Sequence, residues 1–180
     1  MMVFYFCKGI PDDEWYISPG KKGQSVEYFP HFEKQHHLTK AWFDYYADVF
    51  YYKLFSAWDT LGHLLNIMYG LEVDKPSFNR VLKKLKAIRP DLYTELKNLE
   101  DSPEFEQARK TRHDITHNLL PGHVGPGVQR VSKNDITFGV GSYTPSAKIK
   151  ENAIKFLNLF GAALDAIKKQ NAKDDPVRVA

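Results

Sequence analysis

A short segment around residue 112 carries residue types that suit chemistry at a phosphate group. Arg112, His113, Thr116 and His117 lie within six positions of one another. At about 100° per residue they share one side of a helix. An arginine presents a planar fork of donors that matches a phosphate, and an imidazole, whose pKa is ordinarily about 6.5, can accept or donate a proton. The pattern predicts proton transfer at a phosphate without a metal ion or another cofactor.

The neighbours of Arg112 predict how this arginine is held. Apolar residues of the same segment place Arg112 almost on the buried face of the helix: Phe105, Ala108, Ile115 and Leu119. A buried guanidinium needs an anion or a full set of acceptors, so a carboxylate, a phosphate or a subunit interface should face it. A polar stripe with Asp59 and His63 on an earlier apolar stretch is one source of that partner, although a solvated face is the alternative. The residues expected to contact the substrate are Thr116, Arg109, Asp59 and His63.

Periodic apolar residues and turn formers predict the elements that position this segment. Spacings of three and four give a long helix, and prolines at first-turn positions open the later helices. Ser102 is the expected cap of the helix that carries Arg112. The predicted helices cover about 38–69, 76–88, a short stretch from Pro90, 102–118 and a stretch from about Pro145. Such a series predicts an all-α bundle of four to five helices.

Two further segments decorate this bundle. Residues 1–35 hold three short aromatic runs separated by turns, including VFYF at residues 3–6, which predicts an extended arm or a β-hairpin. Glycines and prolines between 122 and 142 predict a small β-excursion before the last helix. The bundle itself is expected over 36–172. The polar stretch from Lys168 onward is expected to fray, with residues 173–180 as a flexible tail.

Composition limits the class of protein. A chain of 180 residues with 43% hydrophobic residues can bury one core, and a net charge of +3 permits a polyanionic partner without demanding one. The single cysteine, Cys7, excludes an internal disulfide and a paired-cysteine zinc site, which predicts a cytoplasmic location. The short apolar start fails as a secretory signal, and charges interrupt residues 41–70, so no membrane association is expected.

The motif Arg112-His113-x-x-Thr116-His117 resembles the R-x4-H signature of the HEPN superfamily, in which a polar residue follows the arginine. This resemblance, which extends in helix order over about residues 38–170, implies a helical bundle that dimerises and cleaves RNA. It implies catalytic roles for Arg112, His117 and His113. The chain departs from toxin-type members at Asn118-Leu119, because no tyrosine lies two residues beyond the histidine, and the sequence identifies no antitoxin or regulatory partner.

The implied reaction fits the residue types. His117 would take the proton of a ribose 2′-hydroxyl or give one to the leaving 5′-oxygen, and Arg112 would stabilise the charge of the pentavalent transition state. His113 would bind the phosphate or orient its counterpart across a dimer.

Three other readings remain open for the same residues. Arg112 and His117 can be a buried ion pair and a hydrogen-bonded core histidine. His113-Asp114-x-x-His117 resembles a metal-hydrolase helix, with the shorter aspartate in place of glutamate and His123 as a possible third ligand. A HEPN-like module that binds nucleotide or RNA without cutting it is the third.

A basic run earlier in the chain bears on the same question. Five cations from Arg80 to Arg89 can track a phosphate backbone, although a solvated face is the common alternative.

Overall fold

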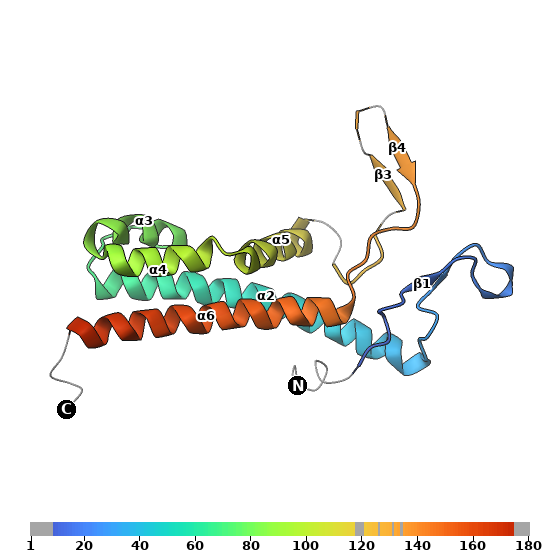
Figure 1. The fold of residues 1–180 in the computed structure, drawn as a ribbon, viewed down its shortest axis with the longest axis horizontal. Coiled ribbons are helices and arrows are strands. Elements are labelled where there is room, and N and C mark those ends of the chain that lie inside the picture. The colour runs from blue at the N-terminus through green and yellow to red at the C-terminus, as the bar shows by residue number, and fades with distance from the viewer. Residues whose placement is uncertain (1–8, 118–120, 126, 131, 134, 175–180) are drawn as a thin grey trace. The chain divides into compact units, whose positions relative to one another are not determined.

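The computed structural model describes residues 9–117, 121–125, 127–130, 132–133 and 135–174. Within these ranges the chain forms five α-helices and two short antiparallel hairpins (Figure 1). The prediction of an all-α bundle with an N-terminal hairpin and a β-excursion before the last helix is therefore confirmed. The VFYF run, Cys7, Asn118-Leu119 and the tail beyond Asp174 lie outside the described residues.

The chain packs as two compact units, and each is assembled from two separate stretches. Unit 1 comprises Met1–Val49 with Thr111–Glu151, and unit 2 comprises Phe50–Lys110 with Asn152–Ala180. Three helices contribute residues to both units: α2 (Lys34–Met68), α5 (Pro103–His117) and α6 (Ser146–Asp174). The domain boundaries expected at residues 35 and 172 stay predictions.

Unit 2 is built around aromatic side chains. Trp58 is fully buried, and its ring centroid lies 4.7 Å from that of Phe78, 5.1 Å from Phe105 and 5.4 Å from Phe160. Edge-to-face pairs at such separations stabilise a core beyond the area that they bury. The apolar stripe predicted for the long helix thus becomes the inner face of α2.

Two short helices complete unit 2. Helix α3 (Phe78–Ile88) buries Phe78, Val81, Leu82 and Leu85, and it packs against α4 (Pro90–Glu100) (Figure 1). Pro90 occupies the first turn of α4, where its missing N–H costs nothing. Gly62 of α2 permits the close approach of α3, because a Cβ there would lie 2.7 Å from the backbone nitrogen of Phe78.

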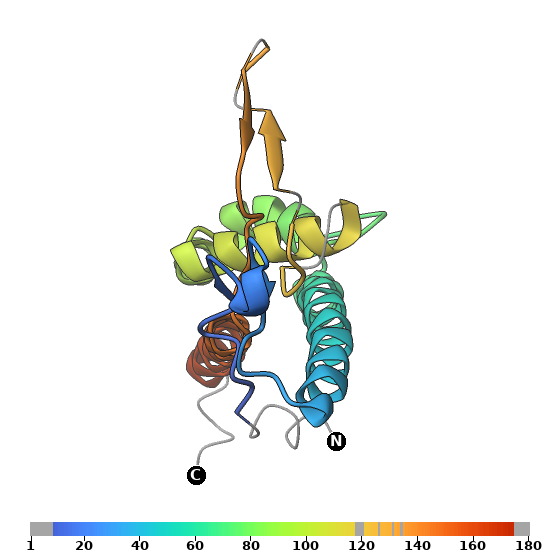
Figure 2. The ribbon, with the colours of Figure 1, turned by 90° about the vertical axis from the view of Figure 1, so that its right-hand side faces the viewer.

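Unit 1 contains both hairpins. Strand β1 (Tyr16–Ile17) pairs with β2 (Glu27–Tyr28), and β3 (Val128–Arg130) pairs with β4 (Ile136–Phe138). The strands of the second hairpin run side by side in the view of Figure 2. Two-stranded ribbons of this length gain little from pairing alone, so their turns and flanking contacts must hold them.

Two ends of the long helices lie close to the positions predicted from the sequence. Helix α2 ends before Gly70, which takes a left-handed conformation with φ of +56°. Helix α6 starts directly after Pro145 and remains helical through residues 168–174, a stretch that we expected to fray. None of the described helices combines the length and the apolar composition that a bilayer crossing requires.

Candidate active site on helix α5

Helix α5 positions the predicted catalytic residues. Ser102 caps it as expected: its hydroxyl accepts a hydrogen bond from the backbone N–H of Phe105 at 3.2 Å. Phe105, Ala108 and Thr111 form its buried face. A helix fixed by a cap at its start and by a buried face presents its other side in a defined orientation.

The expectation that Arg112 lies near the buried face is wrong, because the residue is exposed. The buried side includes Thr111, which a purely apolar pattern overlooks. At about 100° per residue, Phe105, Ala108 and Thr111 lie at about +20°, −40° and −100° from Arg112, so the centre of the buried face is displaced about 40° to one side of it. Because the residue is exposed, Arg112 is not part of the core, and the reading of it as a buried ion pair loses its basis.

The last two turns of α5 bring the other motif residues together on this exposed side. The imidazole centroids of His113 and His117 lie 4.8 Å apart, with the rings tilted by 48°. The Thr116 hydroxyl donates to the backbone carbonyl of Arg112 at 2.8 Å. His117 is the last residue of α5 that the structure describes, and it is exposed. Two imidazoles and a guanidinium on one surface provide groups for proton transfer and for anion binding.

Three further residues predicted to contact substrate belong to unit 2. Arg109 pairs with Glu106 at 2.9 Å, and its guanidinium lies over the ring of Phe105. The Asp59 carboxylate accepts the backbone N–H of Phe78 at 3.3 Å, which places it at the start of α3. His63 is exposed on α2. The substrate roles of these three residues stay predictions.

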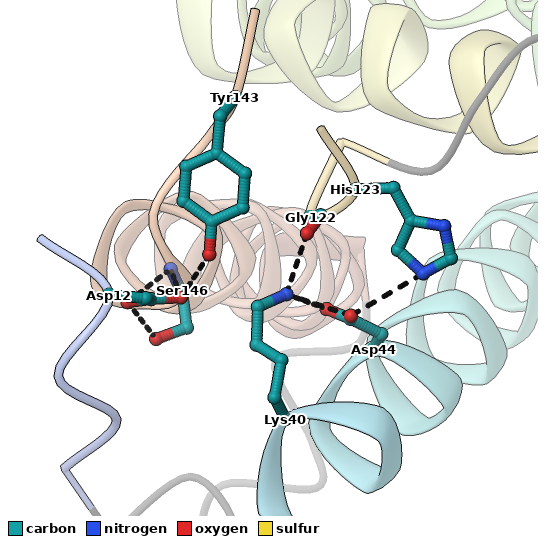
Figure 3. Close-up of polar contacts among 7 residues, drawn as sticks. All are labelled: Asp12, Lys40, Asp44, Gly122, His123, Tyr143 and Ser146. Atoms are coloured by element: carbon teal, nitrogen blue, oxygen red, sulfur yellow. Dashed lines mark hydrogen bonds and ion pairs between the residues drawn. The ribbon is translucent and has the colours of Figure 1, made fainter. Parts of the chain in front are cut away.

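A buried polar network holds the chain that follows α5 (Figure 3). The Lys40 ammonium donates to both carboxylate oxygens of Asp44 at 2.7 Å and to the carbonyl oxygen of Gly122 at 2.8 Å. The side chains of Lys40 and Asp44 are only 8% and 7% exposed. Gly122 fits because it lacks a Cβ, which would collide with the Asp44 carboxylate. The network fixes the backbone five residues beyond His117.

His123, the next residue, extends the network toward solvent. Its Nε2 lies 3.7 Å from the second carboxylate oxygen of Asp44, and half of its side chain is exposed. Figure 3 shows the ring beside Asp44, on the loop that Lys40 anchors through Gly122. Sequence reasoning considered His123 as a metal ligand. Among the residues that the structure describes, no group of three or more histidine, cysteine or acidic side chains could hold a metal ion.

A second part of the network caps helix α6. Asp12 is 1% exposed and accepts hydrogen bonds from the Tyr143 hydroxyl, from the backbone N–H of Ser146 at 3.0 Å and from the Ser146 hydroxyl at 2.8 Å (Figure 3). A carboxylate at a helix N-terminus satisfies free N–H groups and interacts favourably with the helix dipole. Asp12 thus fastens the N-terminal segment to the start of α6.

Burial dominates the electrostatics of this network. Desolvation raises the pKa of Asp44 above its usual value, although Lys40 and His123 oppose that shift. Burial and the negative charge of Asp44 raise the pKa of Asp48 to about 6. Burial and the hydrogen bond to Asp12 also raise the pKa of Tyr143, which keeps its hydroxyl protonated and donating.

Replacing Asp48 by asparagine should stabilise the protein, and the gain over wild type should be larger at pH 7.5 than at pH 4.5. Because the folded pKa of about 6 lies above the ordinary 3.8, the folded state binds the proton more tightly, and stability falls as pH rises from about 4 to 6. Asp48→Asn should therefore gain about 1 kcal/mol at pH 7.5, after a discount for its partial exposure, and only about a third of that at pH 4.5. Urea unfolding at both pH values measures the difference, and an equal gain at both would contradict it.

The network was not predicted from the sequence, although one signal pointed to it. Lys40 and Asp44 stand four residues apart on the side of α2 that also carries Phe43 and Ala47. A charged pair at that spacing within an apolar stripe indicates a buried ion pair. No local signal marks Asp12, because its partners are more than 130 residues away.

Comparison with protein families gives a match over most of the chain. The sequence profile of the family described as HEPN_Cthe2314-like HEPN matches residues 1–168. No curated protein and no solved structure matches the chain significantly.

Proposed function

Because the chain belongs to the HEPN_Cthe2314-like HEPN family, we propose that it is a metal-independent endoribonuclease whose site is the exposed end of helix α5. The observation that carries the proposal is the surface shared by Arg112, His113 and His117, with the two imidazoles 4.8 Å apart. This surface offers the two kinds of group that RNA cleavage through the ribose 2′-hydroxyl requires.

In the proposed reaction, His117 removes the proton of the 2′-hydroxyl, and the 2′-oxygen forms a bond to the adjacent phosphorus. The bond from phosphorus to the 5′-oxygen breaks, and a protonated imidazole returns a proton to that leaving oxygen. Arg112 stabilises the additional negative charge of the pentavalent transition state with its planar donors. One product ends in a 2′,3′-cyclic phosphate and the other in a 5′-hydroxyl. The proposed reaction uses neither an oxidant nor a metal ion.

The proposal includes a two-fold dimer in which the α5 surfaces of two copies face each other. The exposure of Arg112 in the single chain supports this arrangement, because a second copy would bring another Arg112 and His117 to the same phosphate. His113 of one copy would then orient or protonate the group that His117 of the other copy acts on. One copy would supply the base and the other the acid.

The test is cleavage of a labelled RNA in the presence of EDTA. We expect fragments that end in a 2′,3′-cyclic phosphate or its 3′-phosphate hydrolysis product, and we expect no cleavage of DNA of the same sequence, which lacks the nucleophile. The rate should vary with pH as expected for a neutral base and a protonated acid. The active species should have twice the mass of the chain in sedimentation.

Three results separate this proposal from its alternatives. RNA binding without cleavage would identify the binding module. Cleavage that stops in EDTA, or cleavage of DNA, would favour a metal site at His113-Asp114-x-x-His117. A monomer mass for the active species would contradict the dimer and leave the chemistry to the single chain.

A further inference from the structure

Helix α3 and its two flanks concentrate the positive charge of the protein. From Lys75 to Arg89 the sequence contains six lysines and arginines and no acidic residue, whereas the whole chain has a net charge of only +3. The remainder of the chain therefore nets −3. This distribution differs from that of an ordinary solvated helix, in which both signs alternate along the exposed face.

The fold places these cations on one accessible face. Phe78, Val81, Leu82 and Leu85 point into unit 2, and the opposite face presents Arg80, Lys83 and Lys84, all exposed. The Arg80 guanidinium donates to the backbone carbonyl of Lys75 at 3.3 Å, which brings the exposed Lys75 beside the start of this face. We call Lys75, Arg80, Lys83 and Lys84 the α3 basic face.

Acidic residues flank the basic stretch in sequence, at Asp74 and Asp91, but the cations of the α3 basic face form no ion pair in the part of the chain that the structure describes. Cations on other helices do have acidic partners at one turn's spacing: Lys40 with Asp44, Lys97 with Glu100 and Asp101, Arg109 with Glu106, and Lys148 with Glu151. Like charges three and four residues apart repel each other, so the α3 basic face becomes more favourable when an anion neutralises it.

We propose that the α3 basic face binds the phosphate backbone of the RNA substrate, a contact separate from the groups that carry out cleavage. This inference rests on the proposed action on RNA. Positions three and four residues apart on a helix lie about 5–6 Å from each other, so long lysine and arginine side chains can reach successive phosphates. Binding of this kind positions a strand without reading its sequence.

The composition of the face favours RNA over an anionic membrane. A helix that lies in a membrane interface presents large apolar side chains beside its cations. Four of the large apolar residues of α3, Phe78, Val81, Leu82 and Leu85, are buried in unit 2, and only Ile88 at the helix end is exposed. One isoleucine offers far less apolar surface than the apolar face of an interfacial helix. A flexible polyanion fits this surface, and a bilayer does not.

The experiment compares two double variants that lose the same charge. Lys83→Gln with Lys84→Gln removes two cations from the α3 basic face, whereas Lys21→Gln with Lys22→Gln removes two exposed cations from the turn between β1 and β2. The probe is a fluorescent 2′-O-methyl oligoribonucleotide, which lacks the free hydroxyl and so reports binding without cleavage. Anisotropy titrations at several sodium chloride concentrations give the affinity and its salt dependence, and circular dichroism checks the fold.

We expect the Lys83/Lys84 variant to bind at least tenfold more weakly at low salt, and the slope of log affinity against log salt to fall by about 1.4, the value for two lost contacts to a single strand. The Lys21/Lys22 variant should match wild type. Equal losses in both variants, an unchanged slope, or tighter binding to phosphatidylglycerol vesicles than to RNA would overturn the inference. His117→Ala should bind this uncleavable RNA as wild type does. A failure of the proposed cleavage chemistry would therefore appear in the cleavage assay, whereas a failure of this inference would appear in the binding assay.

Discussion

His117→Ala should lower the rate of RNA cleavage by about two to four orders of magnitude while RNA affinity changes less than twofold. The imidazole of His117 is exposed at the end of α5, so its removal creates no cavity and leaves the fold intact. The loss should therefore appear in the rate at saturating RNA rather than in the concentration needed for saturation. Single-turnover cleavage with enzyme in excess measures the rate, and titration of uncleavable RNA measures the affinity.

Two companion variants locate the effect. Arg112→Lys keeps the positive charge but loses the planar fork, so cleavage should fall at least tenfold with the fold unchanged. His31→Ala is the matched control, because His31 is an exposed histidine that pairs with Glu14 at 2.8 Å in the N-terminal segment, and it should cleave at the wild-type rate. Near-normal cleavage by His117→Ala or by Arg112→Lys would reject the role assigned to that residue.

The second large effect concerns stability and lies at Asp12. Asp12→Ala removes the acceptor of the Tyr143 hydroxyl and of both Ser146 donors, and it leaves these groups buried without that partner. Removal of a buried charged acceptor is strongly destabilising, so we expect a loss of about 3 kcal/mol in the free energy of unfolding. For a chain of this size the midpoint of thermal unfolding should fall by about 10 °C, measurable by differential scanning calorimetry.

Asp13 and an isosteric change provide the controls for this effect. Asp13 is exposed next to Asp12, and Asp13→Ala should change stability by less than about 0.5 kcal/mol. Asp12→Asn preserves the shape but turns one acceptor into a donor that faces other donors, so it should destabilise nearly as much as alanine. If the midpoint of thermal unfolding of Asp12→Ala lies within about 2 °C of the wild-type value, the cap contributes little to stability.

Regular helices and their caps could be predicted from the sequence because their signals are local. The apolar period of α2, the prolines that begin α4 and α5, and the Ser102 cap each depend on residues within a few turns. The motif on α5 could be found for the same reason, since a helix brings positions 112, 113, 116 and 117 to one side.

Features that depend on distant residues could not be predicted in this way. The direction of Arg112 was misjudged because the buried face of α5 includes the polar Thr111. The sequence offers Asp59 as one source of a partner for Arg112, beside a solvated face, and no local pattern reveals that its carboxylate accepts the backbone N–H of Phe78 at the start of α3. The partners of Asp12 and the anchoring of Gly122 by Lys40 join segments 82 or more residues apart, which no local pattern reveals.

The division of each unit into two stretches has a consequence for folding during synthesis. Unit 1 needs residues up to Glu151, and unit 2 needs the part of α6 that follows, so neither unit can close while the ribosome is still making α5. Contacts such as Asp12 with Ser146 raise the mean sequence separation of the native contacts, which slows folding. Until α6 has been synthesised, the apolar face of α2 lacks part of the surface that covers it in the folded protein. During that interval the nascent chain is most prone to aggregate.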